Sequence, residues 1–167
     1  DATTLVHLAF NPQKGAKRRD IDAIREENVA TLRSVMASCA RTRVSHLIYL
    51  SSHAVYGSNS DNPIPISEDA AMRPSPDDSS AHAKQQSEMF LQEYALAQDD
   101  IKITTLRSCV VLGNGADSPT SDSYFRPWML GLTAYDPPLQ FVYDDDLARV
   151  LSLVIQREIP GTFNVAG

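Results

Sequence analysis

The sequence has few of the side chains that build disulfide frameworks, metal sites and membrane spans. It contains two cysteines and four histidines in 167 residues, and the histidines lack the spacing of a metal-ligand motif. We therefore expect no metal site, and we expect Cys39 and Cys109 to be buried free thiols of a reducing compartment. No apolar run approaches the roughly 20 residues that a bilayer span requires, so we expect no membrane partner.

Basic residues are also in the minority. The chain has 15 Lys and Arg against 21 Asp and Glu, which gives a formal net charge of -6. Such a surface repels phosphate backbones, so we expect no nucleic-acid partner. No basic segment followed by an apolar segment opens the chain, and we see no secretory signal. These features together predict a cytoplasmic protein.

The apolar and polar segments alternate in the manner of an α/β domain. Apolar, β-rich runs predict buried strands, and apolar residues at three- and four-residue spacing predict helices. The pattern favours a mostly parallel sheet with helices on both faces. The expected strands are 4–9, 44–50, 101–106 (continued by 110–112), 139–143 and 162–165, and the expected helices are 21–39, 81–97 and one that opens at 144 and stops before Pro160.

A proline-rich segment interrupts this alternation. Residues 57–80 contain Pro63, Pro65, Pro74 and Pro76, which exclude a regular element and predict an extended surface loop. At the start of the last helix, three consecutive acids at 144–146 favour the helix dipole and offer a cap.

Eight short segments occur in an order that is typical of one family. They are 6–9 (VHLA), 27–31 (ENVAT), 51–57 (SSHAVYG), 66–74 (ISEDAAMRP), the pair Lys84 and Glu88, 105–113 (TLRSCVVLG), 141–148 (FVYDDDLA) and 161–167 (GTFNVAG). In this order they resemble the NAD-dependent epimerase/dehydratase family, the extended short-chain dehydrogenases/reductases. The resemblance covers nearly the whole chain.

The resemblance implies a three-layer, Rossmann-type α/β fold with a parallel sheet, in which 1–167 form a single partial NAD(P)-binding domain without the N-terminal βαβ portion. It implies NAD or NADP as cofactor, with no residue present that distinguishes them. It implies a small-molecule substrate, either a nucleotide sugar or a related hydroxyl/carbonyl compound. It also implies a homodimer formed through the helices at 21–39 and 81–97.

The same resemblance assigns roles to individual residues. Ser52 would orient the substrate oxygen, and Lys84 would hold the ribose hydroxyls of the nicotinamide. The other positions that would line the cofactor site are His7, Leu8, Ala9, Asn28 and Ser51.

Two features of the family are missing. The glycine-rich turn that lets a backbone approach a pyrophosphate does not occur. The tyrosine that donates or accepts a proton four residues before the lysine is replaced by Ser80, whose hydroxyl is a far weaker acid. His82 is a second candidate for this role, but residues two apart on a helix face different sides, so it should not point with Lys84. The alternative function is therefore a non-catalytic dinucleotide-sensing or interaction protein on the same fold.

Overall fold

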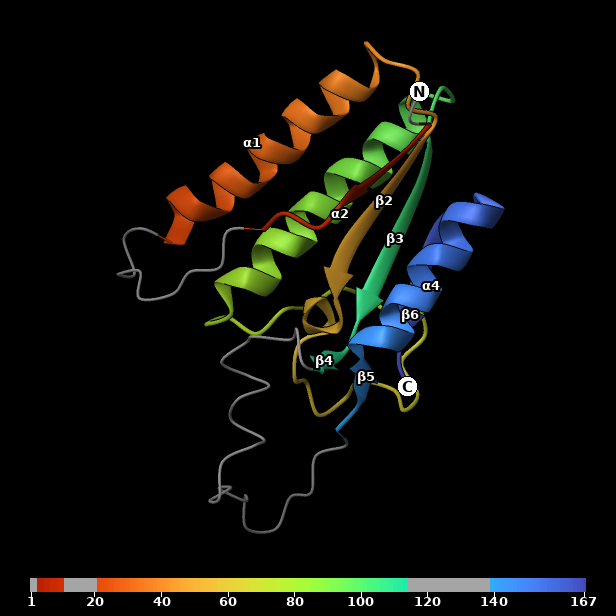
Figure 1. Ribbon diagram of the computed structural model, residues 1–167. Helices are drawn as coiled ribbons and strands as arrows, with labels where there is room; N and C mark the ends of the chain where they lie inside the picture. Colours follow the sequence, from red (N-terminus) through yellow and green to blue (C-terminus); the bar gives the residue numbers. More distant parts are fainter. Residues whose placement is uncertain (1–2, 11–20, 114–138) are drawn as a thin grey trace.

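The computed structural model describes residues 3–10, 21–113 and 139–167. Four parallel strands form the main sheet in the order β1-β2-β3-β6 (Figure 1). These strands are β1 (Thr4–His7), β2 (His46–Ser52), β3 (Lys102–Ser108) and β6 (Gly161–Val165), and the described helices are α1 (Ile21–Cys39), the single 3₁₀ turn η2 (His53–Tyr56), α2 (Ser79–Ala97) and α4 (Asp144–Arg157).

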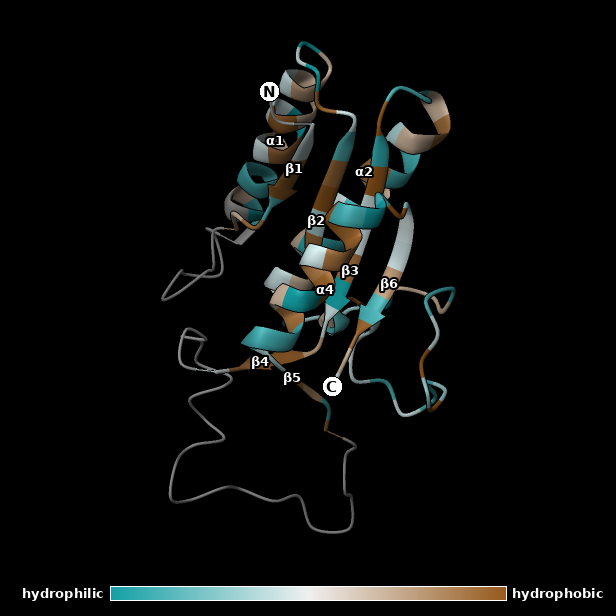
Figure 2. Ribbon diagram, turned by 45° about the vertical axis from the view of Figure 1, so that its right-hand side comes forward, coloured by the Kyte–Doolittle hydropathy of each residue, from teal (hydrophilic) through white to brown (hydrophobic). Residues whose placement is uncertain are grey.

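Helices cover both faces of this sheet, and the side chains of β2 contact helices on each face. Its side chains alternate between the two faces. Leu47 and Tyr49 pack against α1 and α2, whereas Ile48 packs with Leu147 and Val154 of α4. Figure 2 shows hydrophobic residues along β2, as expected for a strand that is buried on both sides. The expected three-layer α/β arrangement is confirmed.

The expected continuation of the third strand is wrong. β4 (Val110–Leu112) leaves the main sheet and pairs in parallel with β5 (Phe141–Tyr143) in a separate two-stranded sheet. The backbone N–H of Cys109 donates to the carbonyl of Val165 at 3.0 Å, which closes the pairing of β3 with β6 one residue after β3 ends. After Cys109 the chain leaves the main sheet, so β4 does not continue β3.

One helix start and one helix cap differ from expectation. α2 begins at Ser79 rather than Ala81, because the Asp78 carboxylate accepts from the Ala81 N–H at 2.9 Å and caps the helix there. The three acids at 144–146 lie in the first turn of α4, but the cap position is Tyr143, which makes no side-chain cap hydrogen bond. α4 begins at Asp144, as expected, and its acids face the helix dipole favourably. The Asp144 carboxylate accepts from the backbone N–H of Asp145 at 2.9 Å.

The expectations for the proline-rich loop and for the two cysteines are confirmed where the structure describes the chain. Residues 57–78 contain no helix or strand, as the prolines predicted. Cys39 and Cys109 are both buried and free. In the described ranges no helix has the length and apolar content to cross a bilayer, and the same ranges hold no cluster of three metal-ligating side chains.

Candidate active site

The candidate site lies where the parallel strands end. β1 ends at His7, β2 at Ser52 and β3 at Ser108, so their carboxyl ends meet at one edge of the sheet. In open α/β sheets ligands bind outside this edge. Figure 1 shows α2 running alongside β2, and a hydrogen bond to the carbonyl of Leu50 places Lys84 of α2 in the same region.

Lys84 is held by a carbonyl and two aromatic rings. Its ammonium donates to the backbone oxygen of Leu50 at 2.6 Å and lies 4.3 Å from the ring centre of Phe10 and 4.8 Å from that of Tyr49. Burial lowers the pKa of Lys84 to about 8, against the opposing attraction of Glu88. The lysine therefore occupies a fixed position at the strand ends and does not extend into solvent.

The two serines at the end of β2 differ in what they contact. Ser51 is buried, and its hydroxyl donates to the Glu88 carboxylate. Ser52 is half-buried, and its hydroxyl oxygen accepts from the Ala54 N–H at 3.2 Å, capping η2. That contact uses a lone pair of Ser52, so its proton can be donated to another group. The Ser51 proton is already donated to Glu88.

Ser80 and His82 both lie in the first turn of α2, before Lys84. Ser80 is half-buried one turn ahead of the lysine, where the family places its tyrosine. The His82 N–H donates to the Asp78 carbonyl at 3.1 Å, so the helix is already regular at this point. His82 is two positions from Lys84 and faces another side of α2.

The predicted cofactor residues on β1 and α1 are split between buried and exposed positions. His7 is buried and stacked on Tyr49, with ring centres 5.8 Å apart, and burial followed by the Lys84 charge lowers its pKa. Leu8 and Ala9 are exposed just beyond the end of β1. Asn28 is buried on the face of α1 that turns toward the sheet.

The structure shows a buried ion pair between Arg107 and Glu88 that the sequence analysis did not place in the site. We call these two residues the hub. Arg107 is 3% exposed and Glu88 1% exposed, and the guanidinium contacts the carboxylate through Nη2 at 2.7 Å and Nε at 3.0 Å. The same guanidinium donates through Nη1 to the Tyr56 hydroxyl at 2.7 Å and to the Glu68 carbonyl at 2.9 Å. Both hub residues lie in segments that resemble family motifs, and this resemblance could have identified them as site residues.

The hub extends to the proline-rich loop through Tyr56. The Tyr56 hydroxyl donates to the side-chain oxygen of Asn164 on β6 at 2.7 Å. Asn164 in turn donates from its backbone N–H to the Glu68 carboxylate at 2.8 Å and from its amide to the Ile66 carbonyl at 3.0 Å. These two hydrogen bonds hold residues 66–68 against the end of β6. In this network the Tyr56 hydroxyl joins Arg107 to Asn164.

Comparisons with known proteins agree with this architecture. The family model described as "NAD dependent epimerase/dehydratase family" matches residues 1–166. An uncharacterized protein of Mycobacterium tuberculosis (strain ATCC 25618 / H37Rv) is 24% identical over 169 residues, which cover 99% of this chain and 44% of that protein.

Two solved structures illustrate the similarity of fold. UDP-glucuronic acid 4-epimerase from Bacillus cereus in complex with NAD has a TM-score of 0.76 and 21% identity, with 100% of this chain and 54% of that chain covered. RMD from Pseudomonas aeruginosa complexed with NADPH has a TM-score of 0.75 and 16% identity, with 98% and 60% covered. The chain therefore spans roughly half the length of the proteins that it matches. With a family model that matches almost every residue, the chain belongs to the NAD-dependent epimerase/dehydratase family.

Proposed function

We propose that this chain is part of an NAD(P)-dependent oxidoreductase of the epimerase/dehydratase type, acting in the cytoplasm on a nucleotide sugar or a related hydroxyl/carbonyl compound. The observation that carries the proposal is the placement of Lys84. Its amine is fixed at the carboxyl ends of β1 and β2 by Leu50, Phe10 and Tyr49. An ordinary solvated lysine on a helix would not be enclosed in this way.

The donor set fits one end of a nicotinamide dinucleotide. Lys84 supplies N–H donors suited to ribose hydroxyls, and Leu8 and Ala9, just beyond the end of β1, are exposed. When bound, the nicotinamide ring exchanges a hydride with the substrate carbon. The 167 residues contain no glycine-rich turn, so these residues would hold the nicotinamide ribose and not the pyrophosphate. In this proposal 1–167 form a single partial NAD(P)-binding domain.

Ser52 is suited to orient the substrate. Its oxygen accepts from Ala54, which fixes the hydroxyl at the end of β2, and its proton can be donated to a substrate oxygen. The preceding residue, Ser51, is buried, and its hydrogen bond to Glu88 helps to hold Ser52 in place. The arrangement can therefore position a hydroxyl or carbonyl oxygen, but neither serine is an effective acid or base at neutral pH.

The proposal is tested by cofactor binding. NADH is titrated into the purified protein while energy transfer from Trp128, the only tryptophan, is followed, with calorimetry as a check; Trp128 lies outside the described residues. We expect saturable binding that Lys84→Ala weakens and that Lys102→Ala, at the other end of the sheet, leaves unchanged. Absence of binding in the native protein would contradict the proposal.

One observation favours a second function, a non-catalytic dinucleotide-sensing or interaction protein. Ser80 occupies the position of the family's tyrosine on α2, and a positioned acid or base typically contributes about 10²–10⁴-fold to rate. A protein of this second kind would bind NADH but convert no nucleotide sugar. Turnover measured beside binding therefore separates the two functions.

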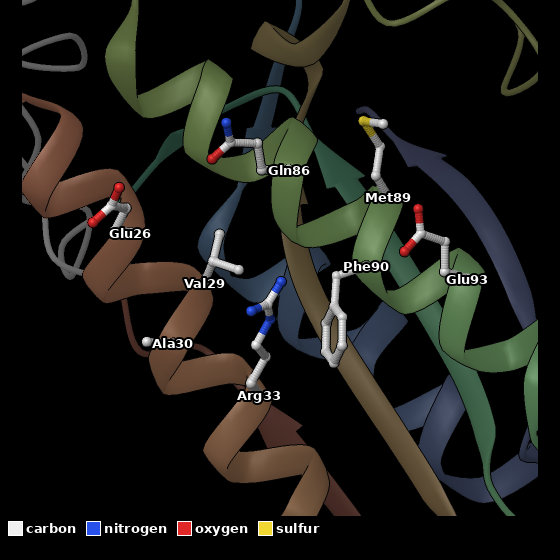
Figure 3. A pocket seen from close by; sticks show the side chains of 8 residues that line it. All are labelled: Glu26, Val29, Ala30, Arg33, Gln86, Met89, Phe90 and Glu93. Atoms are coloured by element: carbon white, nitrogen blue, oxygen red, sulfur yellow. The ribbon is translucent and has the colours of Figure 1, made fainter.

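We also propose a homodimer formed through α1 and α2, which pack side by side. A groove of about 560 Å³ lies between them, and Figure 3 shows the side chains that line it. The Arg33 guanidinium lies over the Phe90 ring, 5.4 Å from its centre, and Met89 is exposed. Glu26 and Glu93 also line this α1–α2 groove. Charged groups of both signs beside apolar side chains suit a two-fold contact, in which Arg33 of one copy can meet a carboxylate of the other.

A further inference from the structure

We infer that His53 supplies the proton-transfer group that the missing tyrosine would have provided, with its Nε2 facing the substrate oxygen. The inference rests on the proposed function, because it assigns a residue to that reaction. His53 directly follows Ser52, in the turn that begins where β2 ends. It thus lies at the carboxyl ends of the strands, the edge at which the substrate is expected.

The imidazole has the orientation and tautomer that a base requires. Nδ1 of His53 lies 3.2 Å from the carbonyl oxygen of Ser108, the last residue of β3. A carbonyl oxygen can only accept, so the contact requires the proton on Nδ1 and leaves a lone pair on Nε2 in the neutral ring. The residue is exposed, so Nε2 can reach a bound molecule. A backbone carbonyl on one ring nitrogen is a common way to orient a histidine whose other nitrogen acts.

Tyr56 and Cys109, which lie near the same edge, are committed to other contacts. The Tyr56 hydroxyl donates to Asn164 and accepts from Arg107 inside the buried network. The Cys109 thiol is buried and donates to the Val165 carbonyl at 3.2 Å, and burial raises its pKa. Neither group can release or take a proton without breaking these contacts.

His7 and Lys84 are also less suited than His53. His7 is buried and its ring is stacked on Tyr49. Burial lowers the pKa of Lys84 to about 8, but its ammonium donates to Leu50 and lies over two aromatic rings, so it is held by these contacts. Compared with Tyr56, Cys109, His7 and Lys84, His53 combines exposure, an oriented ring and a lone pair.

The substrate O–H bond breaks and its proton goes to His53 Nε2, while the hydrogen on the same carbon leaves with its electron pair to an oxidised nicotinamide dinucleotide. The alcohol becomes a carbonyl, the dinucleotide is reduced, and the imidazole becomes imidazolium with Ser108 accepting from Nδ1. In the reverse direction the imidazolium returns the proton to the oxygen. Ser52 holds that oxygen in both directions.

The test uses the full protein with NAD⁺ and a panel of UDP-sugars. His53→Gln can keep an amide N–H on the Ser108 carbonyl but cannot take up a proton, and His53→Ala opens a space for free imidazole. We expect NADH affinity to be unchanged in both variants and turnover to fall about 10²–10⁴-fold, with free imidazole restoring part of the activity of His53→Ala. Arg41→Gln, in the exposed turn between α1 and β2, is the matched control and should keep native turnover.

A second readout does not depend on turnover. Long-range ¹H–¹⁵N spectra of the native protein, with His53 assigned by its loss in His53→Gln, should show a proton on Nδ1 and a shift of Nε2 when a UDP-sugar is added. Native turnover in His53→Gln, or a neutral His53 with its proton on Nε2, would overturn the assignment of His53 alone. A native protein that neither binds NADH nor converts any sugar would overturn the proposed function, and this inference with it.

Discussion

Arg107 and Glu88 form a buried ion pair, with Nη2 and Oε2 2.7 Å apart, that joins β3 to α2 beneath the candidate site. The carboxylate also accepts from Ser51, and the guanidinium also donates to Tyr56 and to the carbonyl of Glu68. The pair thus holds both ends of the segment that contains Ser52 and His53. Two charges removed from water require such complete pairing, because an unpaired partner would be strongly unfavourable.

Breaking this pair should destabilise the protein severely. Arg107→Met leaves the Glu88 carboxylate buried without its cation, and we expect the free energy of unfolding to fall by about 3–5 kcal/mol in urea denaturation. Arg149→Met is the matched control, since Arg149 pairs with Asp146 at 2.8 Å on the exposed side of α4. That change should cost at most about 1 kcal/mol. Equal losses in the two variants would contradict the account of the hub.

The hydroxyl of Tyr56 should determine whether the loop at 66–68 stays on β6. Tyr56→Phe removes the group that bridges Arg107 and Asn164, and we expect a loss of about 1–3 kcal/mol with faster amide exchange confined to 66–69 and the end of β6. Tyr143→Phe, at an exposed tyrosine, is the control and should leave exchange unchanged. Uniform acceleration across the sheet, or none, would show that this hydroxyl does not hold the loop.

Lys84 should make stability depend on pH in a defined direction. Its pKa is about 8 in the native protein, below the ordinary lysine value of 10.5. Between these values the unfolded chain binds more protons than the native chain, so the contribution of Lys84 to the free energy of unfolding rises with pH. The unfavourable burial of its charge applies in full below pH 8 and has disappeared above 10.5.

The measurement compares native protein with Lys84→Met by urea denaturation at several values from pH 7 to 10. Burial raises the pKa of Tyr49, Cys39 and Cys109, and these groups affect both proteins alike. The native protein should therefore gain stability relative to the variant as the pH rises. A difference that is independent of pH would mean that Lys84 is not desolvated.

Much of the fold could be predicted from the sequence, because local patterns determine it. The order of strands and helices follows from hydrophobic periodicity, and the four-residue spacing of Lys84 and Glu88 places them on one side of α2. The pairing of β4 could not be predicted. Val110–Leu112 has the composition of any strand, and its departure depends on a contact between Cys109 and Val165, 56 residues away.

The sequence indicated candidate residues for the site, but it did not indicate which groups those residues contact. Motif resemblance named Ser52 and Lys84, and the structure places Ser52 at the end of β2 and the Lys84 amine on the carbonyl of Leu50; their roles stay predictions. The role of Tyr56 depends on Asn164, 108 residues later, and no local signal records that hydrogen bond. The ring orientation of His53 likewise depends on the carbonyl of Ser108 on another strand. Long-range polar contacts of this kind appear only in three dimensions.

The α1–α2 groove yields a prediction about assembly. Met89→Glu introduces a charge at the exposed apolar position of the groove, and we expect it to convert a dimer into a monomer in sedimentation experiments. Leu96→Glu, which lies on the same helix outside the groove and is strongly exposed, is the control and should leave the mass unchanged. A native protein that sediments as a monomer would contradict the proposed dimer.

The most direct test of the central claim compares turnover in the native protein and in the Ser52→Ala, Lys84→Ala double variant. The full protein is incubated with NAD⁺ and UDP-sugars, and both reduced nicotinamide and rearranged sugar are measured. The account predicts conversion by the native protein and none above background by the double variant, whose fold is verified by circular dichroism. Conversion that survives both substitutions would show that the chemistry does not take place at this edge of the sheet.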